Sequence, residues 1–426
     1  MATVLIIGDG GPEHALARSL ADDADVDRVI CAPGNAGTEA LENVDNFPHA
    51  DPNEIVGLAA REDVDLVVIG PEQSLIDGVA DELRKRGLRV LGFGHHAAEL
   101  AGSKVHAKRF MGRYGLPTPG FRVFNHPRSA LRHLGAMWAE APDQTFVIRA
   151  DEPCRGQGTY SVRTPQQARE VLRSLLTERF CGVGRQVVIE EGIEGQNASL
   201  AVLTDGETLL TLPPARVERR STEDAAGPLT EGLGAYVPAS GLADHTYGRV
   251  EAEILLPTLE GLHAERLAAA GVLEVDLMIT RKGKPYALGY GVGFGDPGTQ
   301  AILALLASDL YPALSACADG ELDRAELHWR DGAAVSVVHC VEGYPDDLTH
   351  QNEPIVGLDE VAEMPNVTVD YDGVARRRGQ LVTRGERILT MTGTGPDLAS
   401  ARETAYEAIG GVRFRGMRYR RDIAEA

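Results

Sequence analysis

Lysine is scarce in this sequence. Arginine supplies nearly all of the 42 basic residues, because lysine occurs only at Lys85, Lys104, Lys108, Lys282 and Lys284. Acidic residues number 63, so the net charge is -21. Nucleic-acid-binding proteins carry a basic stripe or patch, which this sequence lacks, so we expect no nucleic-acid partner. An acidic, lysine-poor surface is typical of proteins that work at high salt, where screening reduces self-repulsion. An ordinary acidic enzyme is the alternative.

The chain also lacks a cysteine motif and a long apolar run. Its five cysteines are widely spaced and form no Cys-x-x-Cys pair, which predicts neither a zinc site nor a disulfide framework. No apolar stretch approaches the roughly 18 residues of a membrane span, and the opening run MATVLIIG is too short for a signal peptide. We therefore expect a cytoplasmic protein without a membrane partner.

Strand and helix patterns alternate in the N-terminal part of the chain. Short β-branched runs such as Val4–Ile7 and Leu66–Ile69 end at glycines and precede helical stretches. They predict a parallel sheet covered by helices on both faces. Beyond Lys104 strands and helices mix, and the C-terminal part predicts antiparallel strands followed by a helix at Leu398–Ile409. The predicted fold class is α/β, with α+β character in the central and C-terminal parts.

A glycine turn follows the first predicted strand. Gly8-Asp-Gly-Gly11 precedes a helix, and backbone N–H groups at such a position favour a phosphate. The full GxGxxG spacing is absent, so a plain tight turn is an equal alternative.

Nine motifs taken together are far more specific. They are Gly8–Ala15, Pro33–Thr38, Gly70–Glu72, Gly102–Lys104, Gly227–Pro228, Gly232–Tyr236, Phe294–Pro297, Gly343–Pro345 and Tyr419–Ile423. In order and spacing they resemble the glycinamide ribonucleotide synthetases, or phosphoribosylamine–glycine ligases, of the ATP-grasp superfamily. The resemblance covers essentially the whole chain.

The resemblance implies a reaction and a domain order. The family belongs to de novo purine biosynthesis and joins glycine to 5-phosphoribosylamine, using ATP to make a glycyl phosphate that the amine attacks. The implied fold is a doubly wound N-domain at 1–103, an ATP-grasp domain at 104–330 and a small mixed C-terminal domain at 331–426. A lid subdomain is expected at about 121–190. We expect a monomer or small oligomer that binds small-molecule substrates.

The resemblance also implies roles for individual residues. The phosphoribosylamine pocket would contain Gly10, Gly11, Gly34, Asn35, Gly37, Thr38, Pro71 and Glu72. The nucleotide would contact Lys104, Arg149, Glu190 and Glu191. Catalytic roles would fall to Arg149, Arg219 and Asp296. The plainer alternatives are a βα turn for Pro33–Thr38, a surface charge for Lys104 and an ordinary strand end for the glutamate pair.

The sequence departs from the family where phosphate and metal are handled. The family run Glu-Tyr-Asn-x-Arg supplies metal ligands through its Glu and Asn, and a phosphate contact through its Arg. Here it reads Gly289-Tyr-Gly-Val-Gly293. The family's Gly-Lys-Gly loop reads Gly156-Gln-Gly158, and Arg149 stands where the family has lysine. Arginine keeps the charge but is not interchangeable with lysine.

One pair of carboxylates offers a substitute metal site. Glu274 and Asp276 are two residues apart on a predicted strand, so both point to one face. They would bind Mg²⁺ or Mn²⁺ in place of the family positions at Gly289 and Gly291, or else form a solvated or arginine-paired face.

Three functions remain open from the sequence. The first is an active ligase of the family type with a rebuilt metal site. The second is an inactive or weakened paralogue that keeps a sugar-phosphate or nucleotide pocket for binding or regulation. The third is an ATP-grasp ligase for a different amine and carboxylate.

Overall fold

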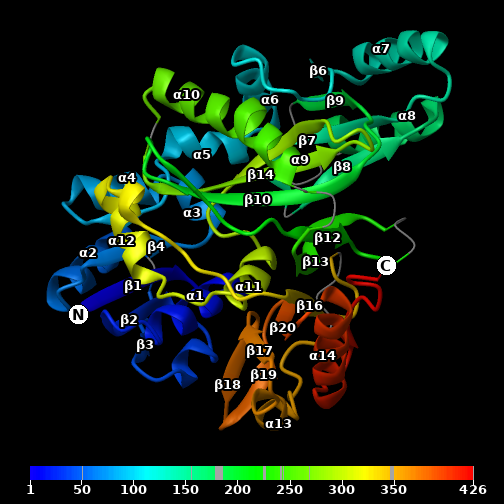
Figure 1. Ribbon diagram of the computed structural model, residues 1–426. Helices are drawn as coiled ribbons and strands as arrows, with labels where there is room; N and C mark the ends of the chain where they lie inside the picture. Colours follow the sequence, from blue (N-terminus) through cyan, green and yellow to red (C-terminus); the bar gives the residue numbers. More distant parts are fainter. Residues whose placement is uncertain are drawn as a thin grey trace.

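The computed structural model describes residues 1–49, 51–154, 156–177, 186–223, 227–239, 242, 244–267, 269–345 and 350–425. Figure 1 shows an N-terminal region in blue, a central region in green, and a C-terminal region in orange and red below it. A smaller sheet with two helices projects at the upper right. No helix within these ranges is long and apolar enough to cross a membrane.

The N-terminal region is a five-stranded parallel sheet in the order β3-β2-β1-β4-β5. β1 is central because Val4, Leu5, Ile6 and Ile7 are all 2% exposed or less, as in a strand covered on both faces. The strands are β1 (Ala2–Gly8), β2 (Val26–Pro33), β3 (Val44–Asn46), β4 (Leu66–Ile69) and β5 (Val90–Leu91). The helices are α1 (Gly11–Ala21), α2 (Pro52–Arg61), α3 (Glu72–Ile76), α4 (Val79–Lys85) and α5 (His95–Gly102). The predicted parallel sheet is confirmed.

The central region is an antiparallel sheet in the order β11-β10-β14-β15. Its strands are β10 (Gln196–Thr204), β11 (Leu209–Thr211), β14 (Gly271–Ile279) and β15 (Pro285–Val292). Helix α6 (Lys104–Arg113) and a continuous helical segment of α9 (Asp244–Val250), η3 (Glu251–Leu255) and α10 (Leu256–Ala264) lie above it in Figure 1. Buried residues of these helices and of β14 and β15 share one core with α5 of the N-terminal region.

The projecting sheet, here called the lid sheet, has the order β6-β9-β7-β8. Its strands are β6 (Phe121–Phe124), β7 (Phe146–Cys154), β8 (Gln157–Val162) and β9 (Val187–Glu191). Helices α7 (Pro127–Glu140) and α8 (Pro165–Thr177) pack on it around Leu134, Phe146 and Leu172. Cys154 is disulfide-bonded, which the cysteine spacing did not suggest, whereas Cys31, Cys317 and Cys340 are free thiols.

The C-terminal region draws two strands from the middle of the chain. Its sheet has the order β12-β13-β16-β20-β17, with β21 paired to β16. The strands are β12 (Arg216–Arg220), β13 (Leu229–Val237), β16 (Ala333–Val341), β17 (Val367–Tyr371), β20 (Arg387–Gly395) and β21 (Met417–Arg418). A separate hairpin is formed by β18 (Val374–Arg377) and β19 (Gln380–Thr383). Its helices are α13 (Leu358–Ala362) and α14 (Leu398–Gly411), while α11 (Gly298–Leu303) packs between α1 and the strands β13 and β16. Helix α12 (Tyr311–Asp319) lies apart from this region, against β5 and β10. The predicted mixed C-terminal fold is confirmed.

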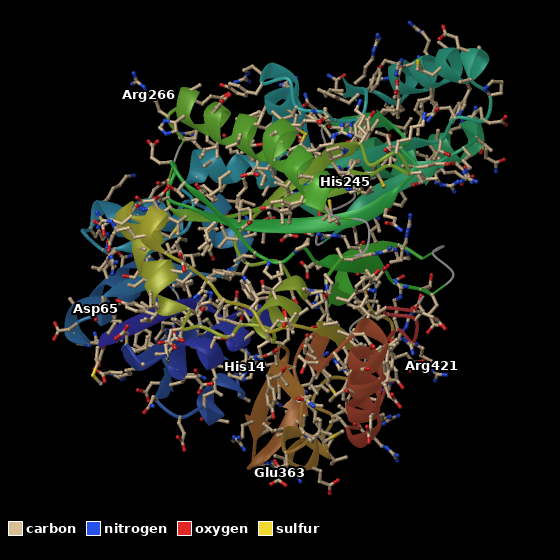
Figure 2. The ribbon with its side chains drawn as sticks, in the orientation of Figure 1. His14, Asp65, His245, Arg266, Glu363 and Arg421 are labelled. Carbon is tan, nitrogen blue, oxygen red and sulfur yellow. The ribbon has the colours of Figure 1, made fainter. Side chains whose placement is uncertain are left out.

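A buried ionic contact fixes the first region on the last. Asp370 of β17 lies 3.2 Å from Nδ1 of His14 and 3.3 Å from a guanidinium nitrogen of Arg18, both on α1. Figure 2 labels His14 where α1 meets the C-terminal region. The glycine turn before α1 is therefore held against β17, which places the turn beside the hairpin β18–β19.

Candidate functional site

Charged side chains converge where the lid sheet meets β14 and β15. This group, called the central cluster, consists of Glu72, Lys104, Lys108, Arg149, Glu190, Arg219, Glu274 and Asp276. All but Lys108 were predicted as functional residues. The remaining nucleotide candidate, Glu191, follows Glu190 on β9 but is exposed, because successive side chains of a strand point to opposite faces.

Glu190 is the buried acceptor at the lid end of the cluster. It is 3% exposed, and its carboxylate lies 3.5 Å from Nζ of Lys108 and 3.6 Å from the Arg149 guanidinium. Its Oε1 is buried without a hydrogen-bond partner. Burial lowers the pKa of Lys108 to about 8 although Glu190 opposes the shift. A buried carboxylate oxygen without a donor is costly, so this atom suits a ligand that donates a hydrogen bond.

Arg149 connects the lid sheet to the central sheet. Its guanidinium donates to the carbonyl of Leu288 at 2.7 Å and would lie 3.8 Å from a Cβ placed on Gly289. Lys104, at the start of α6, donates to the carbonyl of Ala101 at 3.0 Å. Burial lowers the pKa of Lys104, and Glu72 partly opposes this shift. Two cations from different regions therefore face the same bare stretch of β15.

The pairing of β14 with β15 places two carboxylates opposite two glycines. Glu274 pairs with Gly291, and Asp276 pairs with Gly289. A guanidinium nitrogen of Arg219 lies 3.1 Å from Asp276 and 3.7 Å from Glu274. Burial, followed by the charge of Asp276, raises the pKa of Glu274. The arginine-paired face that the sequence left open is present, and both carboxylates do share one face.

Glu72 joins the cluster from α3. Its Oε2 accepts a hydrogen bond from the Val292 amide at 3.0 Å, and burial raises its pKa. A Cβ on Gly291 would lie 3.4 Å from this oxygen and 3.8 Å from Oε2 of Glu274. Glu72 therefore faces the central cluster from the N-terminal region.

Carboxylates of the central cluster are the available ligands for a divalent cation. In the part of the chain that the structure describes, no group of three or more His, Cys, Asp or Glu side chains is placed to hold a metal ion. Mg²⁺ in nucleotide sites, however, uses one or two carboxylates and takes its other ligands from phosphates and water. Glu274 and Asp276 fit this pattern, since the glycines opposite them carry no side chain, although the buried Glu274 also accepts a hydrogen bond from Ser199.

A second site is a cavity of about 880 Å³ between the N-terminal loops, β13 and the hairpin β18–β19. We call it the interdomain cavity. Its lining includes Asp9, Gly34, Asn35, Glu39, Asn46, Glu231, Asp372, Arg376, Arg384 and Arg387. Of these the sequence predicted only Gly34 and Asn35. The three arginines were missed, although the run Arg376-Arg-Arg378 on a short hairpin was a visible signal.

The loop Pro33–Thr38 shapes one wall of the cavity, and its backbone amides already donate hydrogen bonds within the protein. Oδ1 of Asn35 accepts from the amides of Gly37 and Thr38 at 2.7 and 3.1 Å. Oγ1 of Thr38 accepts from the Asn35 amide at 2.8 Å, and the Gly34 amide donates to Gly8 at 3.1 Å. Thr38 is buried, and Gly37 packs against His14 and Tyr371.

Glu13 supports the glycine turn from below. Its Oε2 accepts from the Gly10 amide at 2.7 Å, and a Cβ on Gly70 would lie only 1.9 Å from its Oε1. Burial raises the pKa of Glu13 to about 8. Gly10 is thus bound to Glu13, Gly11 contacts Gln300, and Pro71 caps α3. None of these three predicted residues lines the interdomain cavity in the described part of the chain.

The two sites adjoin at Asp296 and Arg219. Asp296 lies 2.7 Å from the guanidinium of Arg387, which lines the cavity. The neighbouring Gly295 is tight against the central cluster, because a Cβ there would lie 2.0 Å from Oε2 of Glu274. Arg219 donates to the carbonyl of Glu231 at 3.3 Å while its other nitrogen contacts Asp276. Two of the three predicted catalytic residues, Arg219 and Asp296, thus lie between the sites, and the third, Arg149, lies in the central cluster.

The chain was compared with known proteins. Residues 2–101, 102–299 and 334–426 match the N domain, the ATP-grasp (A) domain and the C domain of phosphoribosylglycinamide synthetase. A phosphoribosylamine–glycine ligase of Caldanaerobacter subterraneus subsp. tengcongensis is 36% identical, over 99% of each chain. One of Rhodopirellula baltica is 37% identical, over 99% of this chain and 97% of the relative. The crystal structure of the Thermotoga maritima ligase superposes with a TM-score of 0.83 and 32% identity, over 99% of this chain and all of that one.

These matches agree over the full length. The chain belongs to the phosphoribosylglycinamide synthetase family and has its ATP-grasp fold. The family as a whole uses ATP and a divalent metal.

Proposed function

We propose that the chain is a phosphoribosylamine–glycine ligase of purine biosynthesis. It would convert ATP, glycine and 5-phosphoribosylamine to glycinamide ribonucleotide, ADP and orthophosphate. The observation that carries the proposal is the junction at Arg219 and Asp296. There the central cluster, whose four cations suit a nucleotide, meets a cavity large enough for a sugar phosphate. The predictions of a cytoplasmic location and of a monomer or small oligomer stand beside it as proposals.

The nucleotide would occupy the central cluster. Oε1 of Glu190 lies 3.6 Å from Arg149 but accepts no hydrogen bond, so it suits the amino group of adenine, and Lys108 lies beside the other oxygen of that carboxylate. Arg149 and Lys104 face the triphosphate path along β15. Because charge moves onto the leaving phosphate during transfer, fixed cations on this path lower the barrier. Arg219 would stabilise the acyl phosphate, since it lies between the cluster and the cavity.

Glu274 and Asp276 would hold the divalent cation, Mg²⁺ or Mn²⁺. When bound, such an ion neutralises charge on the phosphates and orients them. Both carboxylates are paired with Arg219, which reaches them from β12 and also donates to the Glu231 carbonyl at the interdomain cavity. Glu72 would remain bound to the Val292 amide and hold β15 in register.

The proposed function is tested by orthophosphate release at high salt, with and without Mg²⁺. Ligase activity predicts release that requires glycine, phosphoribosylamine and Mg²⁺ together. Release with another amine or carboxylate only would favour a different ATP-grasp ligase. Binding of ATP or sugar phosphate without any release would favour the paralogue that only binds.

The metal assignment has its own readout. ATP binding is measured by calorimetry with and without Mg²⁺ for the wild type, Glu274→Gln and Asp276→Asn. We expect each variant to lose the tightening by Mg²⁺, by at least about tenfold or about 1.4 kcal/mol, while binding without metal is kept. Glu363→Gln is the matched control, because Figure 2 places Glu363 beside α13, away from the cluster. Variants that keep the full Mg²⁺ effect would show that these carboxylates are not ligands.

A further inference from the structure

The interdomain cavity has opposite charges at its two ends, and this determines how a sugar phosphate can lie in it. The inference rests on the proposed function, because it deepens the assignment of the phosphoribosylamine pocket. The cavity extends from the buried Arg387 on β20 to the exposed hairpin β18–β19.

The inner end is acidic despite its arginine. Arg387 is 5% exposed and lies 2.7 Å from Asp296, 3.6 Å from Asp372 and 4.0 Å from Glu231. Three carboxylates thus surround one guanidinium. Burial, followed by the charge of Asp296, raises the pKa of Asp372. Asp296 and Glu231 alone still outnumber the single guanidinium, so a phosphate placed there would meet more negative than positive charge, which is unfavourable. Hydroxyl and amine groups, by contrast, can donate hydrogen bonds to the carboxylates.

The outer end is basic. Arg384 lines the cavity from the turn between β19 and β20, and no ion pair of its side chain occurs within the described ranges. Arg376 lines it from β18 and has one partner, Glu39 at 3.8 Å, with both side chains largely exposed. Arg384 also acts on Asp9, another lining residue, because its charge opposes the rise that burial causes in the pKa of that carboxyl. An anion there gains two guanidinium groups, one of which it shares with Glu39 and the other with Asp9.

The glycine loop does not offer a competing phosphate site. The amides of Gly34, Asn35, Gly37 and Thr38 all donate within the N-terminal region already. Binding a phosphate on these amides would require breaking those hydrogen bonds. The loop Pro33–Thr38 therefore limits the shape of the ligand, and the arginines of the C-terminal region supply the charge.

We propose that Arg376 and Arg384 form the phosphate subsite of the interdomain cavity, and that the amine end of the sugar phosphate lies at Asp372. This orientation directs the amine toward Asp296 and Gly295, where the cavity meets the central cluster. The amine then faces the acyl phosphate without any rearrangement of the sugar.

The test uses ribose 5-phosphate, which is stable and carries the same phosphate. Binding to the full chain is measured by calorimetry without ATP or glycine, for the wild type and for Arg376→Gln/Arg384→Gln. We expect the double variant to bind at least about tenfold more weakly. Arg377→Gln is the matched control: its side chain follows Arg376 on the strand, points to the other face and does not line the cavity.

A second variant tests the orientation. Asp372→Asn removes an acidic group from the inner end but keeps an oxygen that accepts hydrogen bonds, so we expect it to bind ribose 5-phosphate as tightly as the wild type or more tightly. The proposal is overturned if the double variant binds like the wild type, or if Asp372→Asn weakens binding as much as the double variant does. Both measurements are independent of turnover. A chain that binds ribose 5-phosphate in this way but releases no orthophosphate would contradict the proposed function alone.

Discussion

A histidine in the middle of the C-terminal sheet predicts sensitivity to acid. His339 on β16 is fully buried, and neither ring nitrogen has a hydrogen-bond partner. Burial lowers its pKa to about 4, against an ordinary value of 6.5. His339 pairs with Leu389 on β20, two residues from Arg387 in the interdomain cavity. Destabilising this strand pair therefore threatens the cavity as well as the sheet.

The size of the effect follows from the two pKa values. Between pH 6.5 and 4 the unfolded chain binds a proton at His339 and the native chain does not, so stability falls as pH falls. A pKa difference of this size reduces the free energy of unfolding by about 2 kcal/mol between pH 7 and pH 5. His339→Leu removes this loss. It also removes an unsatisfied buried donor, which stabilises the variant by about 1–3 kcal/mol at pH 7.

The measurement is urea unfolding of both proteins, followed by circular dichroism at pH 7 and pH 5. Other titrating groups act equally in the two proteins, so the difference between them isolates His339. We expect the variant's advantage to grow by about 2 kcal/mol on acidification. Parallel losses in the two proteins would refute a buried, neutral histidine at this position.

Two further predictions concern the lid and the glycine turn. Gly156 has a φ of +76°, and a Cβ there would lie 2.2 Å from the carbonyl carbon of Thr230. Gly156→Ala should therefore prevent the lid sheet from docking on β13 and lower kcat/KM for ATP about 100-fold. Gly135→Ala on α7, where a Cβ meets nothing within 4 Å, should leave kcat/KM unchanged. Glu13 stays protonated in the native state up to a pH of about 8, so the native chain holds an extra proton from pH 4.5 upward and stability falls as pH rises. Glu13→Gln abolishes that pH dependence. In urea unfolding, the stability of the variant relative to the wild type should rise by about 3 kcal/mol from pH 4 to pH 7. A stability difference that stays constant between these pH values would contradict a buried, protonated Glu13.

The sequence predicted local elements better than their partners in space. Val4–Ile7 was recognisable as a covered strand because its apolar run is short, β-branched and followed by glycine. β12 was not predicted, since Arg216–Arg220 is polar and half-buried and has no period-2 pattern. It becomes a strand by pairing with β13, which in turn pairs with β16 about a hundred residues later. Such long-range pairing leaves no mark in a short window of sequence.

Some functional residues could be predicted from the sequence, and others became visible only in the folded structure. Family motifs located the central cluster and the loop Pro33–Thr38, and the structure brings Glu72, Lys104 and Arg219 together as charged neighbours. Arg387 was missed because its importance comes from burial beside Asp296 and other carboxylates of distant segments. From the sequence alone, an arginine within an apolar strand is interpreted as an exposed charge at the edge of a sheet. The burial that makes it functional is visible only in three dimensions.

The glycines on β15 have a different meaning in the folded protein than in the sequence. Position by position, Gly289 and Gly291 read as lost metal ligands. In the sheet, however, Asp276 and Glu274 are their direct cross-strand partners. Directly opposed residues on one face have Cβ atoms only about 5 Å apart, so a carboxylate on either strand can reach the same point above the sheet. Replacing the β15 side chains by glycine also removes the bulk that would block carboxylates arriving from β14. The glycines on β15 and the carboxylates on β14 are thus directly opposed, which is the arrangement that the proposed substitute metal site requires. This placement is why we propose a working ligase rather than a binding-only relative.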